Sequence, residues 1–319
     1  MKYFNYKFTF KLVVTSGILL IILKYLNSES LIHYLVTVNG VFFSFAIITF
    51  IISIFINTKR LQLLNSIKSN LVSFQRILKI NFIGLFFSIF LPGRTFGDVV
   101  RGYYMADSKV EIESTISTLL IWRIIGIFNM FFIAIIASIF SYPLLKNESI
   151  LFSILGFTFV VIIILFILLN TKLVILEDKN STPVNGNKNF INIKYFVNKV
   201  VRILLSYKNE KRLLLFNFSI SFIVNLFIII TWFFIASSVN ANISIIIFLL
   251  FIPIISILQI IPITFNGVGV REASAIFLFG SIGIKPEVML IISLLYSGLS
   301  ILVSSLGGLV YLFYKKEFD

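Results

Sequence analysis

The sequence of 319 residues contains no cysteine and a single histidine, His33. Disulfides, thiolate metal sites and cysteine nucleophiles are therefore excluded, and so is a metal site built from several histidines. Charge is also scarce, because only 13% of residues are charged, against ~25% in soluble proteins. With 59% hydrophobic residues and a mean hydropathy of +1.04, the chain has too few charges to cover a soluble surface. These values exclude a soluble enzyme, a disordered protein and a disulfide-rich secreted domain, and indicate a polytopic membrane protein.

Six apolar segments are long enough to cross a bilayer as helices, which takes ~20 residues. The predicted spans are 12–26 (with a further turn from 8–11), 34–56, 116–140, 150–169, 213–239 and 289–314.

Two further apolar segments are interrupted by proline and glycine, which break helices. Segment 77–91 is short and ends at a Pro-Gly pair, and segment 243–261 runs into Pro262 and two glycines. Irregular backbone inside a membrane is tolerated only where protein or a wet cavity surrounds it. We therefore expect two re-entrant helical hairpins, at 77–107 and 243–284.

Basic residues cluster in four regions of the chain. These are the N-terminus, the loop after the second span with Lys59 and Arg60, the segment 172–212, and Lys315 with Lys316. With six spans and two hairpins, all four regions fall in the cytoplasm, as the positive-inside rule requires. The net charge of +14 then reflects cytoplasmic loops and anionic lipid headgroups rather than nucleic acid. We expect the cytoplasmic membrane of a prokaryote, with both termini in the cytoplasm.

The two halves of the chain carry a weak internal repeat. Segments 92–101 and 262–271 align without gaps, and four of their ten positions are identical. The first half, 1–145, holds the first hairpin; the second, 146–319, holds a basic cytoplasmic linker, 171–212, and the second hairpin. Because the hairpins enter from opposite sides, the repeat is inverted, a recurring plan of transporters. The predicted fold class is an all-α polytopic membrane protein with about six transmembrane helices plus two re-entrant helical hairpins.

Several charged side chains lie in or beside these apolar segments, where a charge costs ~2.5–3.5 kcal/mol. Asp98 and Arg101 are spaced i, i+3 and share a helical face. Arg271 and Glu272 fall in the first turn of a helix that follows two glycines. A helix N-terminus combined with arginine suits a phosphate group. The candidate substrate-binding residues are Arg94, Asp98, Arg101, Arg123, Asn266, Gly267, Gly269, Arg271 and Glu272.

Each of these charges also has a purely structural interpretation. Asp98 and Arg101 would form an ion pair near the cytoplasmic interface. Arg271 and Glu272 would cross-link re-entrant helices. Arg123, eight residues into its span, would extend its side chain to the cytoplasmic surface.

Two motifs, LPGRTFGDVVR at 91–101 and PITFNGVGVREA at 262–273, together resemble the flippase-like transmembrane family, which includes the membrane region of lysylphosphatidylglycerol synthase. The resemblance covers nearly the whole chain, and Arg123 lies where the family usually has an arginine inside a span. It implies translocation of phospholipids or lipid-linked sugars between leaflets, and a helical fold with two re-entrant hairpins. Because this chain lacks the soluble aminoacyl-transferase domain of full-length synthases, we do not expect it to aminoacylate lipids.

The leading hypothesis is therefore a flippase or scramblase for an anionic phospholipid or a polyprenyl-linked sugar, with no catalytic residue, metal or cofactor. The chain has no phosphate-binding G-x-x-x-x-G-K-[ST] loop, so transport is expected to be passive or ion-coupled. One alternative is an integral-membrane transferase that modifies a lipid, with Asp98 or Glu272 as general base. The other is a non-catalytic membrane subunit whose basic linker docks a cytoplasmic enzyme.

Overall fold

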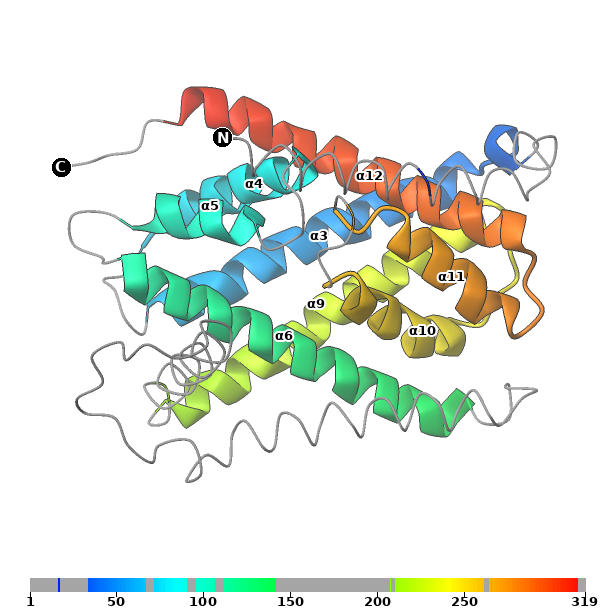
Figure 1. The fold of residues 1–319 in the computed structure, drawn as a ribbon, viewed down its shortest axis with the longest axis horizontal. Coiled ribbons are helices and arrows are strands. Elements are labelled where there is room, and N and C mark those ends of the chain that lie inside the picture. The colour runs from blue at the N-terminus through cyan, green and yellow to red at the C-terminus, as the bar shows by residue number, and fades with distance from the viewer. Residues whose placement is uncertain are drawn as a thin grey trace, which may run out of the picture.

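The structure is a computed structural model that describes residues 17, 34–66, 72–90, 96–106, 112–141, 207, 210–260, 264 and 266–314. All regular secondary structure in this part of the chain is helical (Figure 1). In chain order the helices are α3 Gly40–Asn65, α4 Phe74–Phe90, α5 Phe96–Met105, α6 Ile112–Ser141, α9 Lys211–Ser238, α10 Ile245–Leu258, α11 Val270–Gly280 and α12 Pro286–Phe313.

Four of these helices are long and apolar enough to cross a membrane: α3, α6, α9 and α12. Each has 26 to 30 residues, or roughly 39–45 Å at ~1.5 Å per residue, against ~30 Å of hydrocarbon. They match four of the six predicted spans and confirm a helical membrane protein. The other two predicted spans, 12–26 and 150–169, lie outside the described residues except for Gly17, and so does most of the linker 171–212.

Helices α3 and α9 form an antiparallel pair whose register is set by polar contacts. The contacts are Asn39 N–H to the Ser238 carbonyl at 2.7 Å, Thr49 with Thr231 at 3.0 Å, and Arg60 Nε to Asn217 Oδ1 at 3.0 Å. The first and last contacts are 21 residues apart on α3, or ~32 Å, which is about the thickness of the hydrocarbon core. Hydrogen bonds between spans stabilise helix pairs in a membrane.

The position of Arg60 corrects one sequence-based prediction. Arg60 was expected in a cytoplasmic loop, but α3 continues through it to Asn65, and its side chain is buried. The prediction was wrong because the span was taken to end at residue 56, whereas the helix continues for nine more residues. Lys59 does face outward, whereas Arg60 turns into the bundle and meets polar groups of α6 and α9.

The two expected hairpin regions each contain two short helices. These two-helix units are α4 with α5, and α10 with α11. Figure 1 shows α4 and α5 at the end of the bundle where α3 ends and α6 begins, with α10 and α11 toward the other end. Accordingly, the first unit packs around Leu61 and Leu119, and the second packs with Ala46, Ile133 and Ala137. The re-entrant path of these units and their inverted repeat stay predictions.

Glycines permit the closest helix contacts of the first unit. A Cβ at Gly97 of α5 would lie 2.5 Å from the Gly84 carbonyl oxygen of α4. On the other side of α4, a Cβ at Gly307 of α12 would overlap the Phe82 carbonyl. Small residues at such contacts let helix backbones approach closely in membranes. The first unit is thereby held against α12.

Candidate functional site

Asp98, in the first turn of α5, joins two arginines from different helices. Its Oδ1 is 2.5 Å from Arg101 Nη1 and its Oδ2 is 2.6 Å from Arg123 Nη2. The first contact follows from the i, i+3 spacing on α5. The second contact joins α5 to α6 and gives Arg123 an acidic partner that its neighbours on α6 do not supply. Asp98 and Arg123 keep side-chain exposures of 14% and 22%, so this edge of the group is open, whereas Arg101 is buried.

On the side away from Asp98, Arg101 is hydrogen-bonded to a chain of neutral side chains. Its Nε donates to Asn81 Oδ1 of α4 at 3.0 Å, and Asn81 Nδ2 donates to Thr58 Oγ1 of α3 at 2.8 Å. The guanidinium reaches Asn81 across Gly84, where a Cβ would lie 2.5 Å from Arg101 Cγ. Gly84 therefore keeps open the path by which Arg101 crosses α4.

Arg60 of α3 lies beside this group, and sequence reasoning did not select it. Its guanidinium donates to Asn217 Oδ1 at 3.0 Å, to Asn57 Oδ1 at 3.4 Å and to the Trp122 carbonyl. The Trp122 ring lies near two cations, with the Cζ of Arg60 at 5.3 Å and that of Arg101 at 5.6 Å from its centroid. We name Arg60, Asp98, Arg101, Trp122 and Arg123 the Asp98 group. Among the described residues it contains three guanidinium groups and one carboxylate.

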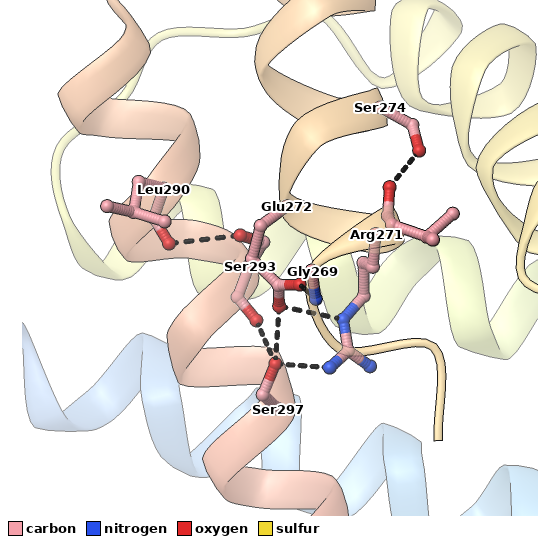
Figure 2. Close-up of polar contacts among 8 residues, drawn as sticks. Gly269, Arg271, Glu272, Ser274, Leu290, Ser293 and Ser297 are labelled. Carbon is pink, nitrogen blue, oxygen red and sulfur yellow. Dashed lines mark hydrogen bonds and ion pairs between the residues drawn. The ribbon is translucent and has the colours of Figure 1, made fainter. Parts of the chain in front are cut away.

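The second group is built at the N-terminus of α11 (Figure 2). Glu272 is fully buried: its Oε2 accepts from the Gly269 N–H at 2.5 Å and its Oε1 accepts from Arg271 Nε at 3.2 Å. Arg271 also donates to Ser297 Oγ of α12, which in turn donates to Glu272 Oε1 at 2.9 Å. The Arg271 Cζ lies 5.5 Å from the ring centroid of Tyr296. This Glu272 group is balanced in charge.

The backbone before α11 turns sharply through three residues with positive φ. Asn266, Gly267 and Gly269 have φ of 48°, 76° and 91°. At Gly267 a Cβ would lie 2.8 Å from Gln259 Cγ, so both the conformation and the space favour glycine there. The turn brings the Gly269 N–H to the Glu272 carboxylate, which satisfies one of the donors that a helix start leaves free.

The two groups are separate in the structure. Thr58, behind the Asp98 group, and Phe50, whose ring contacts Tyr296 at 5.8 Å between centroids, are eight residues apart on α3. That is ~12 Å along the helix axis. No hydrogen bond or ion pair between described residues joins the groups. Of the predicted site residues, Asp98, Arg101 and Arg123 come together, as do Gly269, Arg271 and Glu272, while Arg94 lies outside the described residues.

The residues that sequence reasoning missed share one signal: each is a polar side chain inside an apolar helix. They are Arg60, Asn81, Asn217, Ser293 and Ser297, all buried. Such residues are rare in membrane spans and usually face the bundle. Polarity within the span would have selected them as a set, without indicating which of them meet.

Comparison with known families gives one match. The model of the family described as lysylphosphatidylglycerol synthase TM region matches residues 8–308 of the chain. No curated protein and no solved structure matches.

Proposed function

Because the chain belongs to the lysylphosphatidylglycerol synthase TM region family, we propose that it is a membrane lipid transporter. As a flippase or scramblase, it would move an anionic phospholipid or a polyprenyl-linked sugar between the two leaflets. The membrane-spanning helices and the family support a lipid-related role, and the charges inside the bundle suggest what part of the lipid is handled.

The observation that carries this proposal is the excess of guanidinium in the Asp98 group. A buried charge in a membrane protein is costly unless it has a function or a partner. Here one carboxylate serves two arginines, while a third arginine has neutral partners. A site with surplus positive charge and an exposed edge favours an anion that arrives from outside the chain. Arginine is well suited to hold phosphate through paired N–H donors.

The predicted re-entrant path of α4 with α5 and of α10 with α11 would favour transport over static binding. Broken helices that enter from opposite sides, with helix ends pointing to the middle of the membrane, are a common transporter plan. In the proposed mechanism Asp98, Arg101 and Arg123 handle the phosphate nearer one side. Arg271 forms a second station ~12 Å farther along α3. Asn266 and Gly267, in the turn before α11, would line the route.

A liposome assay tests the proposal directly. Purified protein is reconstituted into vesicles that carry a fluorescent phospholipid in both leaflets, and an impermeant quencher is added outside. In protein-free vesicles only the fluorescence of the outer leaflet is lost. With active protein we expect nearly all of the fluorescence, from both leaflets, to be lost. Chemical change of the lipid would instead favour the transferase. No transfer, together with co-purification of a soluble enzyme, would favour the partner subunit.

Arg123→Gln is expected to slow lipid transfer about tenfold or more. The substitution removes a charged donor at the exposed edge of the Asp98 group, and a hydrogen bond to a charged group contributes ~1.5–3 kcal/mol, where ~1.4 kcal/mol is tenfold. The initial quenching rate measures the effect. Arg212→Gln is the matched control, because Arg212 is an exposed arginine in the first turn of α9. Equal rates for the two variants would remove Arg123 from the transport site.

A further inference from the structure

We propose that Arg60 and the indole N–H of Trp122 complete the Asp98 group as a binding site for the phosphodiester of a membrane lipid. This inference rests on the proposed function and deepens it, since it names the chemical group that is bound and two residues that bind it. Neither residue belongs to the sequence motifs at the two breaks.

Among the described residues, no carboxylate pairs with the buried cation of Arg60. Arg60 is 4% exposed. The three described acceptors of its hydrogen bonds are neutral: two asparagine side-chain oxygens and one backbone carbonyl. Neutral acceptors satisfy N–H groups but leave the charge uncompensated, which is unfavourable in a low-dielectric surrounding. An anion placed beside Arg60 would therefore be held more strongly than at an exposed arginine.

Trp122 supplies a donor with no acceptor. Its Nε1 is buried and has no hydrogen-bond partner in the part of the chain that the structure describes. Buried indole N–H groups usually find a partner. Because both Arg60 and Arg101 lie within 6 Å of this ring, the unmatched donor sits among surplus positive charge. One bound anion would satisfy both needs.

The Asp98 carboxylate shows how a phosphodiester fits the same place. Each of its oxygens takes one arginine, at 2.5 Å and 2.6 Å. A phosphodiester also offers two unesterified oxygens with a shared negative charge, so it can replace the carboxylate on Arg101 and Arg123 while Arg60 and Trp122 lie behind them. In this exchange no covalent bond changes. Asp98 acts as an internal anion that occupies the arginines when no lipid is bound.

The surface beside Asp98 favours a lipid over a soluble phosphate. On α5, Val99 is 63% exposed and Tyr103 is 50% exposed, and Ile116 of α6 is 39% exposed. Large apolar side chains exposed next to a charged group suit a molecule that has acyl chains beside its phosphate. These exposed apolar side chains offer a surface for acyl chains next to the Asp98 group.

Isothermal titration of the full chain in detergent tests the site without relying on transport. The probes are dihexanoyl-phosphatidylglycerol, inorganic phosphate and, as an uncharged control, dihexanoyl-glycerol. We expect the short-chain phospholipid to bind, inorganic phosphate to bind at least tenfold more weakly, and dihexanoyl-glycerol not to bind. Phosphate binding as tight as that of the phospholipid would overturn the assignment to a lipid.

Variants then assign the binding to these residues. Arg60→Gln is expected to raise the Kd of the phospholipid about tenfold or more, whereas Lys59→Gln, the exposed neighbour on the same helix, leaves it unchanged. Asp98→Asn is expected to lower the Kd, because it removes the competing anion while keeping the side chain's shape. A Kd that is unchanged by Arg60→Gln, or raised by Asp98→Asn, would overturn the inference.

Trp122 provides an internal reporter and a second variant, should Arg60→Gln fail to fold. In a Trp232→Phe background Trp122 is the only tryptophan, and its fluorescence is expected to change with the same Kd as the heat signal. Trp122→Phe keeps an aromatic ring but removes the pyrrole part of the indole together with its N–H, so weaker binding by this variant supports the site and unchanged binding contradicts it. Binding that follows these expectations without leaflet transfer would refute transport alone, and transfer with binding indifferent to Arg60, Asp98 and Trp122 would refute the site alone.

Discussion

Glu272→Ala is expected to lower the free energy of unfolding by about 3–5 kcal/mol, the usual cost of removing one partner from a buried ion pair. The substitution leaves Arg271 with no carboxylate among its described partners, in a place where both side chains are almost wholly buried. It also removes the acceptor of the Gly269 N–H at the start of α11. Unfolding in detergent by increasing denaturant, followed by circular dichroism, measures the loss.

Two control variants show whether the loss of stability comes from the burial of Glu272 or from its charge. Glu287, in the first turn of α12, is partly exposed and forms no ion pair with a described residue, so Glu287→Ala is expected to change stability little. The double variant Arg271→Met with Glu272→Gln removes both charges and is expected to recover most of the loss, because apolar or neutral replacements of a buried pair are often tolerated. If Glu272→Ala alone were as stable as the native chain, the Glu272 group would have no structural role.

Alanine substitutions at two glycines of α12 are expected to have opposite signs. At Gly307 the new Cβ would overlap the Phe82 carbonyl and press on Phe86 Cβ at 3.0 Å, so Gly307→Ala should cost about 1–3 kcal/mol as α4 is pushed away. At Gly298 a new Cβ would meet no side chain or neighbouring helix within 4 Å. Gly298→Ala should therefore raise stability by about 0.5–1 kcal/mol, the usual advantage of alanine over glycine in a helix.

The comparison uses one helix, one substitution and the same unfolding measurement, so the environment of the Cβ is the main difference. Because α4 also carries Asn81, which holds Arg101, Gly307→Ala is further expected to weaken lipid binding, whereas Gly298→Ala is not. Equal effects at both positions would mean that α4 and α12 do not pack closely through Gly307.

The class of the protein and the position of its helices follow from local properties of the sequence. Apolar length predicted α3, α6, α9 and α12 within a few residues at most ends, and proline and glycine predicted where α4 and α10 end. Spacing on a single helix was also sufficient for Asp98 with Arg101, since i, i+3 residues share a face in any α-helix. These features depend on neighbours along the chain, which the sequence states directly.

Partners on other helices were decided by the tertiary structure. The sequence places Arg123 inside a span, but its partner Asp98 comes from α5, and Ser297 reaches the Arg271–Glu272 pair from α12. Arg60 and Lys59 are adjacent and equally charged, yet one is buried and the other exposed. Such differences depend on how each helix is rotated and on the register in which it packs, as the contact of Arg60 with Asn217 illustrates. The mean hydropathy of a segment averages over whole helix turns, so it carries no information on that rotation. The sequence alone therefore determined a helical membrane protein with charged residues beside its interrupted segments. Only the packing of the helices decided which arginines gather around Asp98.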